Sequence, residues 1–223
     1  MVKYERELAI IMPPLNLNDA LVAYRQGIFP MAESKTSNEI FWIKPEERGI
    51  IPIGKLHISR SLKKYIKSKN IKITINMSFD EVVQLCADRP TSWINNELLK
   101  MYRNLKNEGS AVSIEAWDGK DLIGGLFGVI VGSCFCAESM FSSAINGSKL
   151  ALVATMGLLK FNGFQLFDTQ FPNKHLESMG GITIPQSKYE KFLISCINEN
   201  CGITDFPNDY SWSEIMQLNN DKL

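Results

Sequence analysis

The chain has 223 residues, and its 24 lysines and arginines balance 24 aspartates and glutamates. This length suits one large domain, or one domain with a small appendage. The balanced charge excludes a global field that attracts nucleic acid, so any such binding needs a local basic patch.

The cysteine count argues against a disulfide framework, because the five cysteines are odd in number and lack paired spacings. No signal peptide or long apolar span is visible, so we expect a cytoplasmic protein with no membrane partner. The chain has only two histidines, and neither lies at metal-ligand spacing from a second cysteine pair. We therefore expect no metal site. Cys134 and Cys136 are expected to be buried strand thiols.

The first part of the chain predicts a small N-terminal domain over residues 1–46, followed by the main domain over residues 47–223. A short helix is expected over residues 19–24, with Asn18 as its cap and Gly27 as its left-handed end. Residues 28–52 contain three prolines among aromatic side chains. That composition predicts irregular but packed structure.

The densest basic run begins at Arg60, and either Ser59 or Ser61 can cap the helix that carries it. Its basic residues are Arg60, Lys63, Lys64, Lys67 and Lys69. Such a run indicates either a solvated helix face or a phosphate-binding surface, and the spacing alone leaves both open.

The middle of the chain predicts a strand at residues 72–75, a helix opened by a capping box of Ser78 and Glu81, and a second amphipathic helix from near Asn95. Three strands then follow at residues 112–117, 122–131 and 133–137, joined by tight turns. Glycines inside this meander, including Gly124, indicate close approach of a ligand or another element.

The last part predicts a helix from Ser148, a strand over residues 166–170, a short helix near His175, a strand over residues 182–185 and a helix over residues 187–196. The whole order is that of an α+β acyltransferase of the acetyltransferase type. We therefore expect a mainly antiparallel central sheet flanked by helices.

Three polar residues on two of these strands form the candidate site. Glu138 is expected at a strand exit, and Asp168 and Gln170 lie two residues apart on one strand face. Unpaired polar groups cost roughly 1–3 kcal/mol when buried, so the pair must either be bonded or face a cleft. The alternatives are a buried network that fixes strand register and a functional site.

Several ordered motifs resemble the leucyl/phenylalanyl-tRNA protein transferase family. They are Tyr-Arg-Gln-Gly-Ile-Phe-Pro (24–30), Leu-His-Ile-Ser-Arg-Ser (56–61), Ser-Trp-Ile (92–94), Gly-Gly (124–125), Glu-Ser-Met-Phe-Ser (138–142), Ser-Lys (148–149), Asp-Thr-Gln (168–170), His-Leu (175–176) and Ile-Pro (184–185). Ordered matches over most of a chain are far more specific than any single motif.

The resemblance implies a small N-terminal domain and an acetyltransferase-like (GNAT) catalytic domain that uses neither a metal nor acyl-CoA. The residues support the last point, because an acyl-CoA enzyme of this fold has a glycine-rich pyrophosphate loop after its central strand. Glu138 begins that segment here and would repel a pyrophosphate.

The family's activity implies roles for the three polar residues. Gln170 is expected to accept a hydrogen bond or proton from the acceptor's α-amino group, and Asp168 to orient Gln170 and polarise its amide. Glu138 is expected to add charge complementarity for an acceptor that begins with Arg or Lys. Positioning is expected to exceed proton transfer, since a glutamine is a poor base.

The resemblance also implies an apolar pocket for a leucyl, phenylalanyl or methionyl side chain. Its expected residues are Leu126, Phe135, Ala137, Met140, Thr155 and Leu159. Trp93 is expected to be a stacking surface for the terminal adenosine or a pocket wall, and Met31 a further apolar substrate contact. Ordinary core packing is the alternative for each of these positions. The family often has tryptophan at position 31 and glycine at position 137, and aromatic residues at 155 and 159, so the preference among donors stays open.

Charged tRNA is the partner that the resemblance gives to Arg60, Lys63, Lys64 and Lys67, through sequence-tolerant phosphate contacts. The product would be a protein marked for N-degron proteolysis. Two other functions remain as alternatives: an acyl-CoA-dependent N-acyltransferase of the same fold, and a non-catalytic module that binds tRNA or degrons.

Overall fold

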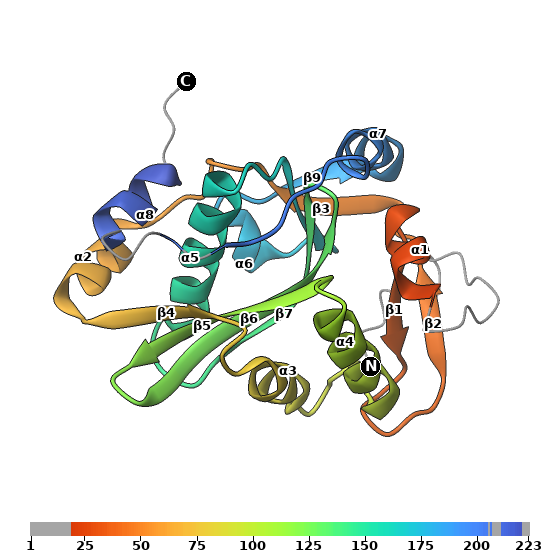
Figure 1. Cartoon of the computed structure of the whole chain (residues 1–223), viewed down its shortest axis with the longest axis horizontal. Coiled ribbons are helices and arrows are strands. Elements are labelled where there is room, and N and C mark those ends of the chain that lie inside the picture. The colour runs from red at the N-terminus through yellow and green to blue at the C-terminus, as the bar shows by residue number, and fades with distance from the viewer. Residues whose placement is uncertain (1–18, 205, 207–210, 220–223) are drawn as a thin grey trace.

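The computed structural model describes residues 19–204, 206 and 211–219. The predicted cap Asn18 and the remainder of residues 1–18 lie outside this range. The described chain folds around one large sheet, with a small two-stranded sheet at its side (Figure 1).

The large sheet has seven strands in the order β4-β5-β6-β7-β8-β3-β9. The strands are β3 (Glu47–Ile51), β4 (Ile71–Ile75), β5 (Ala111–Asp118), β6 (Asp121–Val131), β7 (Cys134–Ser142), β8 (Leu166–Gln170) and β9 (Ile182–Pro185). β7 and β8 pair in parallel, while the other neighbours pair antiparallel. The α+β class is confirmed, but the sheet is mixed rather than antiparallel, because helix α5 (Gly147–Phe161) returns the chain from β7 to the start of β8.

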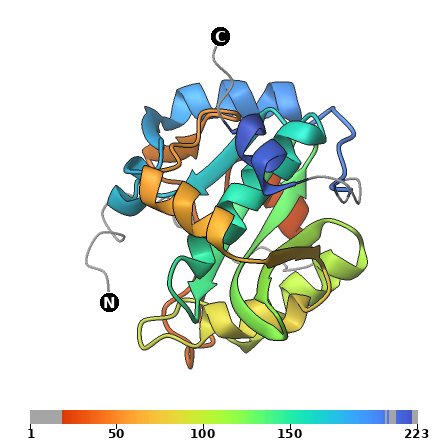
Figure 2. The ribbon, with the colours of Figure 1, turned by 90° about the vertical axis from the view of Figure 1, so that its left-hand side faces the viewer.

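Helices cover both faces of this sheet, and each face has its own hydrophobic core. On one face lie α2 (Arg60–Ser68), α5, α6 (Lys174–Glu177) and α8 (Trp212–Leu218), of which Figure 2 shows α2 and α5 on the same side of the strands. The other face carries α1 (Ala20–Arg25), α3 (Phe79–Ala87), α4 (Asn96–Asn107) and α7 (Gln186–Cys196). The central strands are therefore buried on both sides.

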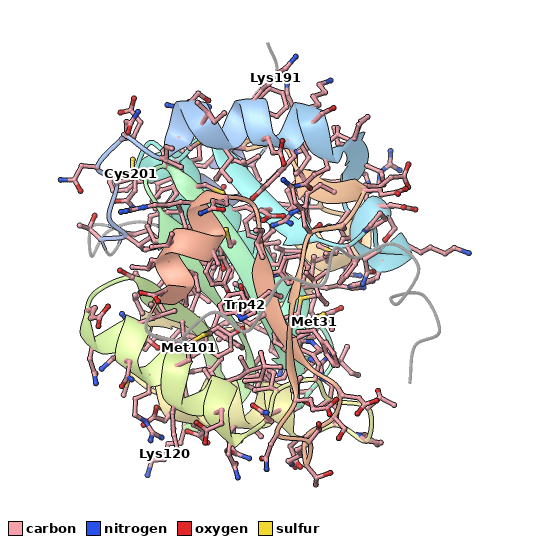
Figure 3. All side chains as sticks on the ribbon, turned by 90° about the vertical axis from the view of Figure 1, so that its right-hand side faces the viewer. Met31, Trp42, Met101, Lys120, Lys191 and Cys201 are labelled. Carbon is pink, nitrogen blue, oxygen red and sulfur yellow. The ribbon has the colours of Figure 1, made fainter. Side chains whose placement is uncertain are left out.

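The small sheet and β3 correct the expectation of irregular structure over residues 28–52. β1 (Phe29–Ala32) and β2 (Ile40–Ile43) pair antiparallel, and β3 inserts between β8 and β9. Figure 3 looks onto this side of the molecule and labels Met31 and Trp42 on the two short strands. Pro30, the second residue of β1, is tolerated because both strands of a two-stranded sheet are edge strands.

Helix caps differ in how well the sequence indicates them. Ser59 accepts a hydrogen bond from the N–H of Leu62, so the predicted cap of α2 is confirmed. Asn95 caps α4 in the same way through the N–H of Leu98. The predicted capping box of α3 is wrong, because Ser78 makes no side-chain cap and its N–H instead donates to Glu115.

A glycine contact explains why β6 contains a glycine at position 124. A Cβ on Gly124 would lie 2.1 Å from the carbonyl carbon of Gly147, at the start of α5. No side chain fits there, so the close approach expected from the glycine content is made by a helix. Among the described residues, no helix is long and apolar enough to cross a membrane.

Candidate active site

A β-bulge in β7 positions Glu138. Phe127 of β6 is opposite Ser139 and Gly128 is opposite Ala137, so Glu138 is the extra residue of the bulge. β7 continues to Ser142, so Glu138 lies within the strand and the expected strand exit is corrected. The bulge turns Glu138 toward α1 and α4.

Three donors surround the buried carboxylate of Glu138. Tyr24 Oη donates to Oε1 at 2.8 Å, and Tyr102 Oη donates to Oε2 at 2.7 Å. The side-chain Nε2 of Gln170 donates to Oε1 at 2.9 Å. A carboxylate accepts about four hydrogen bonds, so these three hold it firmly and leave room for one more donor.

Burial raises the pKa of Glu138 to about 7, although the hydrogen bonds from Tyr102, Tyr24 and Gln170 oppose that rise. The same burial, together with the nearby carboxylate, raises the pKa values of both tyrosines well above 10.0. The tyrosines therefore remain donors, while Glu138 changes its charge near neutral pH.

Asp168 lies in β8 and is fully buried. Arg48 binds it in a bidentate way through one edge of its guanidinium, with Nε to Oδ1 at 2.8 Å and Nη2 to Oδ2 at 2.5 Å. Tyr189 Oη donates to Oδ2 at 2.8 Å, and the main-chain N–H of Gln170 donates to Oδ1 at 2.8 Å. Among the described residues, Asp168 bonds the main-chain N–H of Gln170, whereas the side-chain amide of Gln170 bonds Glu138. The expectation that Asp168 polarises the side-chain amide is therefore corrected.

Gln170 ends β8 in the left-handed conformation, with φ at 64°. This conformation is uncommon for a residue with a side chain and is held here by the bond to Asp168. In its ionised form Glu138 only accepts hydrogen bonds, so in that form the side-chain amide nitrogen of Gln170 faces it, as in the structure. No described residue donates a hydrogen bond to the side-chain amide oxygen, so Gln170 can offer that oxygen as an acceptor.

Glu138 and Gln170 both line a cavity of about 650 Å³. Four further predicted site residues line it as well: Leu126, Ala137, Met140 and Trp93. Phe167, Leu152 and Leu176 add apolar wall, and the polar residues of the lining include Ser142, Asn173 and His175. The lining thus combines apolar side chains with polar ones, and the Glu138–Gln170 pair is part of it.

Other predicted pocket residues lie behind the wall. Phe135 is fully buried and stacks on Phe167, with ring centroids 5.7 Å apart. Thr155 and Leu159 are fully buried in α5, where the Thr155 hydroxyl donates to the carbonyl of Ala151. These three do not line the cavity of the described structure.

Met31 is half-buried on β1 and is also outside the lining. The N–H of the next residue, Ala32, donates to the carbonyl of Trp93 at 3.0 Å. Met31 is therefore close in the chain to a residue that contacts Trp93, which lines the cavity.

The predicted basic residues share one helix. Arg60, Lys64 and Lys67 are exposed on α2, and Lys63 is half-buried. Lys69, just beyond the helix, pairs with Asp118 at 3.0 Å, which partly neutralises it. Leu62 and Ile66 anchor the opposite face of α2 in the core.

Sequence reasoning missed Arg48, Tyr24, Tyr102 and Tyr189 as members of the site. Tyr24 lies in a recognised motif and Tyr102 in a predicted buried stripe, so both could have been flagged. Arg48 is 120 positions from Asp168, and no local pattern joins them. All five cysteines are free, and the described residues contain no cluster of three or more metal-ligating side chains.

A carboxylate and an amide that line one cavity together with apolar side chains form the kind of site that suits acyl transfer to an amine. The family model "Leucyl/phenylalanyl-tRNA protein transferase" matches residues 50–194, and the model of the same family's N-terminal domain matches residues 15–46. The chain belongs to the leucyl/phenylalanyl-tRNA protein transferase family.

Curated relatives agree over most of the chain. The leucyl/phenylalanyl-tRNA protein transferase of Paracoccus denitrificans is 46% identical over 79% of this chain and 84% of its own length. That of Maricaulis maris is 39% identical over 89% of this chain and 94% of its own. The structure of L-PGS from Bacillus licheniformis has a TM-score of 0.41 and 11% identity, over 77% of this chain and 56% of that chain. This last likeness is too weak to support an argument.

Proposed function

We propose that this protein transfers an aminoacyl group from a charged tRNA to the N-terminal amine of an acceptor protein. The single observation that supports this most is the Glu138–Gln170 pair lining a cavity that also has apolar side chains in its wall, in a chain of this transferase family. The reaction forms an amide bond and breaks the ester bond to the tRNA ribose. The proton lost by the amine balances the ribose hydroxyl that is released.

An aminoacyl ester is already reactive, so the site mainly has to present a neutral amine in line with the ester carbonyl. Free α-amino groups titrate near about 7.7–8.0 and are mostly protonated at neutral pH. The free amide oxygen of Gln170 is placed to accept a hydrogen bond from the amine. The remaining acceptor position of Glu138 suits a cationic group, which favours acceptors that begin with Arg or Lys.

The donor specificity that we propose is for apolar side chains. Leu126, Met140 and Phe167 supply an apolar wall beside Glu138. A leucyl, phenylalanyl or methionyl side chain matches such a wall, whereas a charged side chain would be buried without a partner.

The exposed basic face of α2, formed by Arg60, Lys63, Lys64 and Lys67, is the surface that we propose for tRNA. Its side chains project from a helix anchored by Leu62, and they suit phosphate oxygens of any sequence. The same proposal includes an acetyltransferase-like main domain over residues 47–223 beside a small domain over residues 1–46. It also includes action in the cytoplasm, with N-degron marking of the product.

The decisive experiment incubates the purified protein with leucyl-, phenylalanyl- and methionyl-tRNA, each with peptides beginning with Arg, Lys, Asp or Ala. Mass spectrometry of the peptides reads both specificities at once. We expect transfer of the three apolar residues to Arg and Lys peptides. Transfer from acyl-CoA instead, or binding of charged tRNA without any transfer, would overturn the proposal.

A further inference from the structure

Arg48 is a fully buried arginine in β3, outside the cavity lining. Its guanidinium makes a two-point ion pair with Asp168, and Nη1 donates to the main-chain carbonyl of Gly27 at 3.0 Å. A buried charge needs such complete pairing, because the desolvation of an ion costs several kcal/mol. Burial opposes the charge of Arg48, but Asp168 outweighs that effect and raises the pKa of the guanidinium.

Two aromatic rings enclose the same guanidinium. The Arg48 Cζ atom lies 4.9 Å from the ring centroid of Phe29 and 4.3 Å from that of Tyr189. Tyr189 also donates to Asp168, so both ions are fixed by one side chain from α7. Cation–π contacts and a bidentate pair together allow one geometry for Arg48.

This geometry connects two parts of the site. Through Asp168, Arg48 holds the N–H of Gln170 and so its left-handed backbone. Through the carbonyl of Gly27, it holds the end of α1, the helix that brings Tyr24 to Glu138. A displacement of Arg48 would therefore move both Tyr24 and the side-chain amide of Gln170, which are two of the groups bonded to Glu138.

We propose that Arg48 is a positioning residue for the transfer reaction, and that Asp168 acts through the backbone of Gln170 rather than as the acceptor of a proton from the substrate. This rests on the proposed function. Asp168 is fully buried, outside the cavity lining, and its charge is matched by Arg48. It has no surface on which to meet an amine.

The test separates stability from positioning with three variants. Arg48→Met leaves the buried carboxylate of Asp168 without an ion-pair partner, so the melting temperature of this variant should fall sharply. The double variant Arg48→Met/Asp168→Leu replaces a buried pair by apolar side chains, which often restores stability. We expect the double variant to unfold near the wild-type temperature, yet to have a kcat at least about tenfold lower, with KM for leucyl-tRNA within about twofold of wild type.

Arg48→Lys keeps the charge but loses the planar fork. We expect it to fold and to retain more activity than Arg48→Met, while remaining below wild type. This variant decides the question if the double variant does not fold. The matched control is Arg103→Met, which removes the exposed arginine of an Arg103–Asp80 pair and should leave kcat unchanged.

Wild-type kcat in a stable double variant or in Arg48→Lys would show that the Arg48–Asp168 pair is only structural. That result would overturn the positioning role and leave the proposed function untouched. A loss confined to KM would also overturn the positioning role. If the wild-type protein transfers from none of the charged tRNAs, the proposed function fails, and this inference fails with it.

Discussion

Gln170 and Glu138 are paired through a hydrogen bond of 2.9 Å, and this pairing decides which atom of each faces the cavity. The amide nitrogen is committed to the carboxylate, so the amide oxygen is available to a substrate.

Gln170→Ala should lower transfer at least about tenfold, which corresponds to about 1.4 kcal/mol at the transition state. The reason is loss of the acceptor for the substrate amine, while the backbone bond to Asp168 is retained. Single-turnover transfer from leucyl-tRNA measures the effect. Gln165→Ala, on an exposed position just before β8, is the control. Equal rates for the two variants would make the amide dispensable.

Glu138→Gln should change the pH dependence of stability. Burial raises the Glu138 pKa from 4.5 to about 7. The protonated carboxyl group therefore contributes to the free energy of unfolding of the wild-type protein in full below pH 4.5, and this contribution is lost as pH rises through about 7. Relative to wild type, the variant should gain up to about 3 kcal/mol of unfolding free energy between these limits.

Urea unfolding of both proteins at a series of pH values measures this difference. Glu81→Gln, on the exposed side of α3, is the control and should run parallel to wild type. A constant difference between Glu138→Gln and wild type would contradict the raised pKa.

Strand β3 and the end of β8 form the element-level device that orients Gln170. The register shifts between Gly49 and Ile50, because Thr169 is an extra residue opposite β3. A Cβ on Gly49 would lie 2.5 Å from Thr169 Oγ1 and 2.6 Å from the carbonyl oxygen of Phe171. Gly49 thus permits β8 to end in its bulged form.

Gly49→Ala should therefore displace Gln170, lowering both transfer and thermal stability, since backbone atoms cannot yield as a side chain can. Gly202→Ala is a matched control, because a Cβ there meets nothing within 4 Å. Melting curves and single-turnover rates of the two variants test the prediction. A fully active Gly49→Ala would mean that the end of β8 tolerates a shift.

Strand β7 supplies the apolar wall through Met140, whose side chain is half-buried at the cavity. Met140→Ala should enlarge the pocket and shift preference from leucine toward phenylalanine, with a loss in leucyl transfer. Pocket discrimination among apolar groups is about 1–3 kcal/mol per methylene, so the shift should be partial. Ratios of kcat/KM for the two charged tRNAs measure it, and the exposed Met77→Ala is the control. A better rate with arginyl-tRNA or aspartyl-tRNA would contradict the apolar pocket.

At the scale of the whole molecule, the formal net charge is zero, so tRNA binding must come from one surface. Replacing Lys63, Lys64 and Lys67 of α2 with Ala should weaken tRNA binding alike for different tRNAs. It should also reduce the slope of log affinity against log salt concentration by up to about 3, because each lost phosphate contact removes roughly one released counterion.

Binding titrations at several salt concentrations test this. Replacement of Lys100, Lys106 and Lys191, on helices of the opposite face of the sheet, is the control. An unchanged slope in the α2 variant would move the tRNA surface elsewhere.

The sequence by itself determined the element order between residues 53 and 196, because amphipathic periods and turn residues are local properties. Ser59 and Gly27 are examples, and both predictions of helix ends are confirmed. It missed α8, although Ser211 and Glu214 form a capping box there. It also indicated that Glu138, Asp168 and Gln170 belong together, since unpaired polar groups on apolar strands need partners.

Only the tertiary structure decided what each of these groups faces. β3 enters the sheet between β8 and β9, far from its neighbours in sequence, and so brings Arg48 to Asp168. A bulge in β7 turns Glu138 toward Tyr24 and Tyr102. Strand pairing between distant segments and a one-residue bulge leave no periodic signal in the sequence, yet they set which side chains are buried and which line the cavity.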